Sequence, residues 1–290
     1  MNLPASRIAA AFVAACRDEL EAPKPGNVHL FAPGHRMTAA QFEESAAAAA
    51  GPLARHGAGV GARILGAVEA TRKAVGATNT NLGIVLLCAP LAAAAERPAT
   101  DLRSALAGVL VDLDVEDAKL AFRAIVLANP AGLGRVKRHD VFAPAHVTLR
   151  EAMAEAADRD RIAAQYDTDF VDVFERGEPL LRSTRERTND PRWGTLAVFL
   201  GFLSAFPDSH VVRKHGPTVA EEVRRRAVAL LERLCGGEVP PDLATITGEL
   251  LEWDRELKNR EINPGTSADL TVATLFVHRL TEHLAVGAQE

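Results

Sequence analysis

The chain has 290 residues, enough to bury a large hydrophobic core, and its 48% hydrophobic and 24% charged residues are typical of a soluble globular protein. Its net charge is −5, whereas nucleic-acid-binding proteins typically carry clustered positive charge. The longest uncharged apolar run, Leu82–Ala95, is too short to span a membrane, and three separated cysteines predict neither disulfides nor a zinc site. We therefore expect a cytoplasmic protein without nucleic-acid or membrane partners.

Apolar residues recur at three- and four-residue spacing through most of the chain, and this spacing predicts helices. The predicted helices are Leu3–Leu20, Ala39–Arg55, Gly61–Val75, Leu82–Ala95, Leu102–Leu110, Val115–Ala128, Leu149–Ala157, Leu196–Phe206, Val219–Leu234, Leu243–Leu257 and Ala268–Leu284. The best strand candidate, Val141–Val147, contains Pro144, which argues against a strand. We predict an all-α protein: a single domain over residues 1–290, with polar loops forming one cleft and a flexible loop near residues 129–147.

The first polar junction follows the first predicted helix and reads Pro23-Lys24-Pro25-Gly26-Asn27-Val28-His29, then Gly34-His35-Arg36-Met37. The two prolines favour a rigid, non-helical path from which Lys24 projects. An ammonium group is a good partner for phosphate, so Lys24 is a candidate ligand, with Asn27, His29 and His35 beside it. The alternative is a plain connector with a solvated lysine.

Two further junctions precede predicted helices. Thr78-Asn79-Thr80-Asn81 stands before the apolar run at Leu82, and four polar residues exceed what capping needs, which favours a sugar or base ligand at Asn79 and Asn81. Asp112-Leu113-Asp114 carries two carboxylates that could bind Mg²⁺. The alternative for Asp114 is an ordinary helix cap.

The last two junctions are the richest in functional groups. In Asp208-Ser209-His210-Val211-Val212-Arg213-Lys214-His215-Gly216, the cations suit a triphosphate, and a charged turn is the alternative. Asn263-Pro264-Gly265-Thr266-Ser267-Ala268-Asp269-Leu270 contains helix breakers, and Thr266 or Ser267 can then cap the following helix. A helix start is a ready seat for phosphate, and Asp269 in its first turn could hold a metal ion or a substrate hydroxyl. The alternative is an ordinary cap.

In this order, the junctions resemble the triphosphoribosyl-dephospho-CoA synthase family, which makes the prosthetic-group precursor of citrate lyase and malonate decarboxylase. The matching segments are Pro23–Gly26, Gly34–Met37, Asn79–Gly83, Asp208–Gly216 and Asn263–Leu270. The resemblance implies an all-helical transferase. It would move the triphosphoribosyl group of ATP to a hydroxyl of dephospho-CoA and release adenine.

The resemblance also implies roles for individual residues, with ATP as a substrate and Mg²⁺ as the expected metal ion. Asp269 and Asp208 are the candidate catalytic carboxylates, and Asp112, Asp114 and Asp269 the candidate metal ligands. The candidate substrate and phosphate ligands are Lys24, Asn27, His29, His35, Asn79, Asn81, Arg213, Lys214, Asn263, Gly265 and Ser267.

The chain departs from the family pattern where the family usually carries a His-Lys or His-Arg pair, because Asn81-Leu82 stands there. The loss of a cation should weaken or redirect the binding of one substrate. Two alternatives therefore stay open. The chain could act on another nucleotide or acceptor in a one-carbon coenzyme pathway of pterin or furan type, or it could be a helical nucleotide-binding protein without catalysis. A homodimer is also left open.

Overall fold

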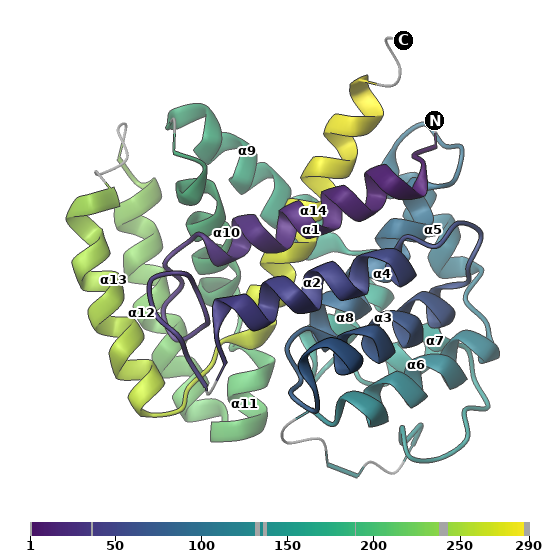
Figure 1. Ribbon diagram of the computed structural model, residues 1–290. Coiled ribbons are helices and arrows are strands. Elements are labelled where there is room, and N and C mark those ends of the chain that lie inside the picture. Colours follow the sequence, from purple (N-terminus) through teal and green to yellow (C-terminus); the bar gives the residue numbers. More distant parts are fainter. Residues whose placement is uncertain are drawn as a thin grey trace. The chain divides into compact units, whose positions relative to one another are not determined.

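The computed structural model describes residues 2–35, 37–130, 134–135, 138–188, 190–237 and 243–286. Within these residues the chain is all-α, with no strand and only isolated bridges in the loop after the first helix (Figure 1). The helices are α1 Ala5–Leu20, α2 Ala39–Leu53, α3 Val60–Val75, α4 Leu82–Ala95, α5 Leu102–Val111, α6 Val115–Ala128, α7 Leu149–Ala154, α8 Arg161–Asp167, the π-helix η1 Val173–Gly177, α9 Glu178–Arg187, α10 Pro191–Ala205, α11 Ser209–His215, α12 Pro217–Cys235, α13 Leu243–Asn259 and α14 Gly265–Val286.

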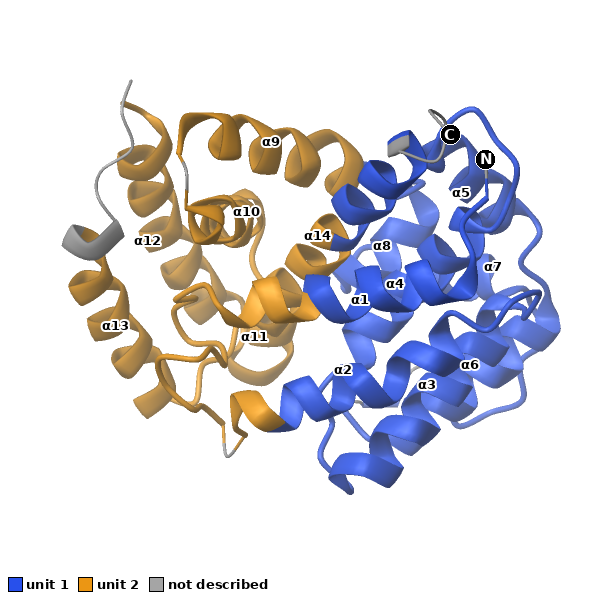
Figure 2. Cartoon of the chain, turned by 45° about the horizontal axis from the view of Figure 1, so that its top comes forward, with its two compact units in different colours: residues 1–15, 41–171, 276–290 blue, residues 16–40, 172–275 orange. Residues whose placement is uncertain are grey.

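The chain divides into two compact units (Figure 2). Unit 1 comprises residues 1–15, 41–171 and 276–290, and unit 2 comprises residues 16–40 and 172–275. The expectation of a single domain with one cleft stays a prediction.

Unit 1 is organised around α4, which is apolar on all sides and almost entirely buried. The hydroxyl of Tyr166 in α8 donates to the carbonyl of Leu86 in α4 (2.6 Å), which satisfies a buried polar group. Helix α3 packs on α6 so closely that a Cβ on Gly61 would lie 2.6 Å from backbone atoms of Asp117. A side chain at Gly61 would therefore push the two helices apart.

Unit 2 has a core formed by α10, α12 and α13. Its buried side chains include Trp193, Leu196, Phe199, Leu200, Leu203, Val223, Ala227, Leu230, Leu250, Trp253 and Leu257. On α12 and α13 these residues recur every three or four positions, which is the pattern of a helix with one buried face. Ala22 in the loop before α2 and Ile262 in the junction after α13 belong to this core, so both segments pack against it.

All predicted helices are present, most within a few residues of the expected ends, but sequence periodicity missed α8, η1, α9 and α11. Helix α9 is mostly polar and buries only Leu181 and Thr184, so it shows little apolar periodicity. Its Pro179 lies in the first turn, where proline is tolerated. Helix α11 has seven residues, too few for a periodic signal. Sequence periodicity did not predict α9 because it is polar, and did not predict α8, η1 and α11 because they are short.

The segment near residues 129–147 lies partly outside the described residues, namely at 131–133 and 136–137. Its described part contains no strand. Asn129 ends α6 in a left-handed conformation, and Asp140 accepts a hydrogen bond from the backbone of Phe142 (2.8 Å). The flexibility of this loop stays a prediction. In the described residues, no individual helix combines the length and apolarity needed to cross a membrane, although the bent pair α10 and α11 meets that test jointly by length and composition.

Candidate functional site

The junction before α14 packs directly on the loop that follows α1, so the first and last sequence junctions meet within unit 2. Gly26 has φ +78°, and a Cβ there would lie 2.9 Å from the carbonyl oxygen of Ile262 and from Cδ of Pro264. The side-chain amide of Asn27 donates to Oδ1 of Asn263 (2.8 Å). Only glycine allows this approach, and the approach brings two candidate ligands, Asn27 and Asn263, into contact.

Asp208 caps two helices with one carboxylate. Oδ1 accepts the backbone N–H groups of His210 (2.9 Å) and Val211 (3.1 Å) at the start of α11. Oδ2 accepts both the backbone N–H and the hydroxyl of Ser267, each at 2.8 Å, in the first turn of α14. Burial raises the pKa of Asp208 above its ordinary value, although these hydrogen bonds oppose the rise.

This arrangement corrects two expectations about the start of α14. The helix begins at Gly265 rather than Ala268, and the hydroxyl of Ser267 binds Asp208 instead of capping the helix by itself. The N–H group expected to receive a phosphate at Ser267 is already held by a carboxylate. A helix N-terminus attracts any anion, and here the anion is a side chain of the protein.

His210 is held against the same junction. A Cβ on Gly265 would lie 2.6 Å from Nδ1 of His210, so glycine leaves room for the ring. The backbone N–H of His210 also donates to the hydroxyl of Thr266 (3.2 Å). Burial, followed by the charges of Arg213 and Lys214, lowers the pKa of His210 to about 4. The ring is therefore neutral near pH 7.

The alternative of a plain connector with a solvated lysine is wrong for Lys24. Its side chain is fully buried, and Nζ donates to the carbonyl oxygens of Glu19 (2.6 Å) and Val28 (3.0 Å). Nζ also lies 3.1 Å from the Glu19 carboxylate. Burial lowers the pKa of Lys24 and raises that of Glu19, and their mutual attraction opposes both shifts. The ammonium group closes the loop onto the end of α1, and its role as a phosphate ligand stays a prediction.

Asp254 and Lys258 of α13 are members of this site that the motifs did not reveal. Oδ1 of Asp254 accepts the backbone N–H of Gly26 (2.9 Å), and Oδ2 accepts from Nζ of Lys258 (2.8 Å). Asp254 is buried between Leu250 and Leu257 on the apolar face of α13. A carboxylate at a core position of an amphipathic helix is the signal that could have identified it.

Two histidines of the first junction lie beside Asp254 and Gly26. Nε2 of His29 is 3.4 Å from Oδ2 of Asp254, and its ring is fully buried. Nε2 of His35 lies 2.7 Å from the carbonyl oxygen of Gly26. Burial lowers the pKa of both rings, more strongly than these neighbours raise it. Arg36, which belongs to the same motif, lies outside the described residues.

The remaining candidates of unit 2 are more exposed. Arg213 and Lys214 are exposed in the last turn of α11, where cations favour the helix dipole, and Nζ of Lys214 lies 3.4 Å from the carbonyl oxygen of Glu261. Asp269 is half-buried in the second turn of α14, because the helix begins at Gly265, so the prediction that it lies in the first turn is wrong. Burial, then the charges of Glu19 and Asp269, raises the pKa of Cys16 in α1. Asp269 therefore acts electrostatically on the end of α1.

Asn79 and Asn81 belong to unit 1, and helix contacts account for their polar groups. Oδ1 of Asn79 accepts the backbone N–H of Leu82 (3.2 Å) and so caps α4. The amide of Asn81 donates to the hydroxyl of Thr71 in α3 (3.0 Å). Thr80 bonds to Ser45 of α2 (2.6 Å). These polar side chains connect α2, α3 and α4, so their number alone is not evidence for a ligand.

The two unit 1 carboxylates proposed as metal ligands are also engaged. Asp114 forms a capping box with Asp117 at the start of α6, and Asp112 makes an exposed ion pair with Arg97 (2.8 Å). Across the described residues, no group of three or more His, Cys, Asp or Glu side chains is arranged to hold a metal ion. The metal role of Asp112, Asp114 and Asp269 therefore stays a prediction without geometric support.

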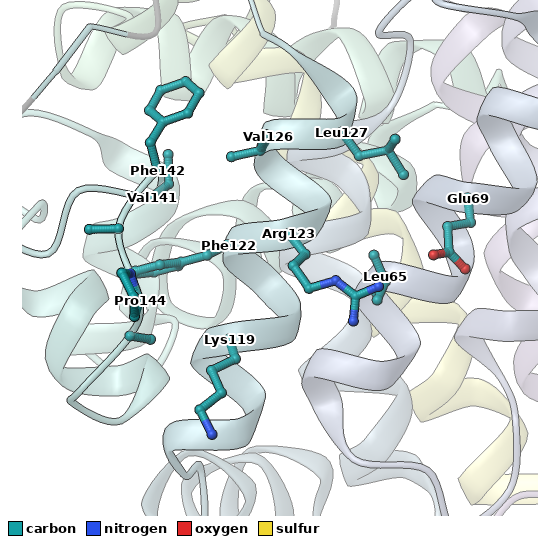
Figure 3. A pocket seen from close by; sticks show the side chains of 12 residues that line it. Leu65, Glu69, Lys119, Phe122, Arg123, Val126, Leu127, Val141, Phe142 and Pro144 are labelled. Carbon is teal, nitrogen blue, oxygen red and sulfur yellow. The ribbon is translucent and has the colours of Figure 1, made fainter.

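A separate apolar pocket of about 630 Å³ lies in unit 1 between α3, α6 and residues 141–145 (Figure 3). Phe122, Val126 and Phe142 are among its apolar lining residues, with Lys119 and Arg123 at its edge. None of the candidate site residues lines it. The pocket is therefore distinct from the polar junctions of unit 2.

The chain was compared with models of protein families, with known proteins and with solved structures. The family model described as ATP:dephospho-CoA triphosphoribosyl transferase matches residues 5–287 of the chain. The chain belongs to this family. It is 30% identical over 112 residues to a Pseudomonas putida protein assigned by name as a 2-(5''-triphosphoribosyl)-3'-dephosphocoenzyme-A synthase, and the match covers 38% of each chain.

A solved structure shows the same fold. The crystal structure of an Archaeoglobus fulgidus protein, assigned by name as a triphosphoribosyl-dephospho-CoA synthase, superimposes with a TM-score of 0.64 at 26% sequence identity. The match covers 82% of this chain and 97% of the other. The all-helical fold expected from the family resemblance is confirmed.

The neutral His210 predicts a pH dependence of stability. Because its pKa is near 4 in the folded state and about 6.5 when unfolded, its contribution is fully present above pH 6.5 and is lost as the pH falls towards 4. In this window the slope of unfolding free energy against pH should be smaller in His210→Gln than in the wild type, by up to roughly 1.4 kcal/mol per pH unit.

Urea unfolding at several pH values between 7 and 4.5 measures this slope. The raised pKa values of Asp208 and Glu19 act in the opposite direction at acidic pH, so the difference between variant and wild type is the informative quantity. His56→Gln, at an exposed position in unit 1, controls for the loss of an imidazole as such. Equal slopes for wild type and His210→Gln would contradict the neutral buried ring.

Proposed function

We propose that this protein transfers the triphosphoribosyl group of ATP to a hydroxyl of 3'-dephospho-CoA and releases adenine. The match of the family model to residues 5–287 carries the proposal. The meeting of the first, fourth and fifth junctions within unit 2 supports it. The names of the similar proteins favour dephospho-CoA as acceptor over the one-carbon coenzyme and non-catalytic alternatives.

The proposed reaction breaks the bond between the anomeric carbon and adenine and forms a bond from that carbon to the acceptor oxygen. The acceptor hydroxyl loses its proton to a base, and adenine leaves with a proton. The ribosyl carbon gains positive charge in the transition state, as in glycoside cleavage. A nearby carboxylate can both take the proton and stabilise that charge.

Asp269 suits this carboxylate role better than its neighbours do. Asp208 and Asp254 are buried, so a substrate hydroxyl would reach their oxygens less readily. Asp269 is half-buried in the second turn of α14. We assign the Asn27 and Asn263 pair to the ribose or base, and Arg213 with Lys214 to the triphosphate.

Magnesium enters this proposal only together with the triphosphate. Mg²⁺ typically uses one or two carboxylates and completes its shell with phosphate oxygens and water. Unit 2 would supply Asp269 as its protein ligand, and the bound ion would neutralise phosphate charge. The described residues contain no cluster that would hold the ion alone.

Asp269→Asn should lower the rate of adenine release by about 10²- to 10⁴-fold, because the base and its charge are both lost. Adenine is measured by chromatography after incubation with ATP, Mg²⁺ and dephospho-CoA. Glu282→Gln, at an exposed position near the other end of α14, is the matched control and should retain activity. Unchanged turnover in Asp269→Asn would remove Asp269 from the mechanism.

The same assay tests the proposed function. Adenine release that requires dephospho-CoA supports it. Release only with a different acceptor would instead support the one-carbon coenzyme alternative. ATP binding without adenine release with any acceptor would support a non-catalytic protein.

A further inference from the structure

Asp254 lies beneath the loop between α1 and α2 and binds three groups at once. Oδ1 accepts the backbone N–H of Gly26 (2.9 Å), and Oδ2 accepts from Lys258 (2.8 Å) and lies 3.4 Å from Nε2 of His29. Its side chain is 4% exposed. Removing one partner of a buried carboxylate strongly destabilises the folded protein, because the charge is left uncompensated. The three contacts of Asp254 therefore depend on one another.

The hydrogen bond from Gly26 to Asp254 fixes the loop at Gly26. Gly26 adopts φ +78°, and its carbonyl oxygen lies 2.7 Å from Nε2 of His35. Both polar groups of this residue are therefore held, one by α13 and one by the same loop. Lys258 adds a second tie, because its Nζ also donates to the carbonyl of Ala32 (3.2 Å). Contacts from α13 therefore hold the loop at Gly26 and at Ala32.

Asn27 follows Gly26 directly, and its amide reaches Asn263. An asparagine side chain has both donors and an acceptor, so this one bond leaves the Asn27 carbonyl oxygen and the Asn263 amide nitrogen for other partners. Any shift of Gly26 would move Asn27 away from Asn263. A displacement of about 1 Å in a positioning contact can reduce a reaction rate by roughly 10²-fold.

We propose that Asp254 is a positioning residue of the transferase, which acts through Gly26 to hold Asn27 against Asn263. This inference rests on the proposed function. Asp254 touches no reacting atom, since it lies beneath the loop and is saturated by Gly26, Lys258 and His29. Burial would raise the pKa of Asp254, but the nearby His29 and the hydrogen bond from Lys258 keep it below its ordinary value, so it acts as an anion.

Two substitutions separate the functions of this carboxylate. Asp254→Asn keeps an oxygen that can accept from Gly26 but loses the charge that faces Lys258. Asp254→Ala loses both. We expect kcat for adenine release to fall about tenfold in Asp254→Asn and about 100-fold in Asp254→Ala, with KM for ATP changed less than about threefold. Glu256→Gln, an exposed carboxylate on the same helix, is the control and should remain within about twofold of wild type.

A double-mutant cycle distinguishes positioning from a general loss of structure. If Asp254 acts through Asn27, then Asp254→Asn should lower kcat by less than about twofold in an Asn27→Ala background. Multiplicative losses in the double variant would overturn the proposal. This cycle uses the milder Asp254→Asn, so it decides the matter even if Asp254→Ala fails to fold.

Hydrogen exchange at the Gly26 amide gives a readout that does not depend on catalysis. The amide should be protected in the wild type and in Asp254→Asn, and should exchange at least about tenfold faster in Asp254→Ala. If the wild type releases no adenine, the proposed function fails, while this measurement still decides whether Asp254 holds the loop. Equal exchange in all three proteins, or full kcat in a folded Asp254→Ala, would overturn the inference.

Discussion

Lys24→Met is expected to lower the free energy of unfolding by about 3–5 kcal/mol, because it leaves the Glu19 carboxylate buried without its partner. The side chain of Lys24 is fully buried and that of Glu19 is 5% exposed. The substitution also removes the donor to the carbonyl oxygens of Glu19 and Val28. Unfolding in urea, followed by circular dichroism, measures the change.

A second substitution separates charge from packing at this position. Adding Glu19→Leu to Lys24→Met removes the uncompensated charge and should restore part of the lost stability. The recovery should be incomplete, since the two backbone carbonyls remain without the ammonium group. Lys119→Met, which removes an exposed lysine from a surface ion pair with Glu116, is the control and should change stability little. A Lys24→Met protein as stable as this control would contradict the buried ion pair.

Asp208→Ala is expected to cost a similar amount, about 3–5 kcal/mol, because one carboxylate satisfies the starts of two helices. The substitution leaves the N–H groups of Val211 and Ser267 without their acceptor, and leaves that of His210 with only its longer bond to the hydroxyl of Thr266. Urea unfolding again provides the measurement. Asp208→Asn should be intermediate, since its oxygen can accept on one side while its amide nitrogen cannot accept from Ser267.

Asp190→Ala is the matched control for this prediction. Asp190 caps a single helix, α10, through the backbone N–H of Arg192 (3.0 Å), and its loss should cost roughly 1 kcal/mol. The difference between the two variants measures the contribution of the contact between Asp208 and α14. Equal losses would mean that Ser267 finds another partner and that Asp208 caps only α11.

Local patterns predicted most of the helices correctly. Helices α4 and α6 have the predicted ends, because apolar spacing and the capping box at Asp114 are properties of a few neighbouring residues. The highly polar α9 and the short α11 were missed, since their stability comes from contacts with other helices and from the Asp208 cap.

The site was only partly predictable for the same reason. Asn27 and Asn263 were identified from their motifs, but their contact joins residues 236 positions apart. Asp254 and Lys258 carry no motif and belong to the site only because α13 passes beneath Gly26. The role of Asn79 and Asn81 as ligands stays a prediction, because the structure shows contacts of their amides with α3 and α4.

The amino-acid sequence by itself determined the helical fold class, the family and the order of the polar junctions, because periodicity, caps and motifs are encoded locally along the chain. Only the tertiary structure decided which junctions meet and which charges are buried. Lys24 shows the reason most clearly: a lysine in a proline-rich loop looks solvated, and packing of the loop against the end of α1 removes it from water. Burial is a property of distant segments in contact, so sequence spacing does not reveal it.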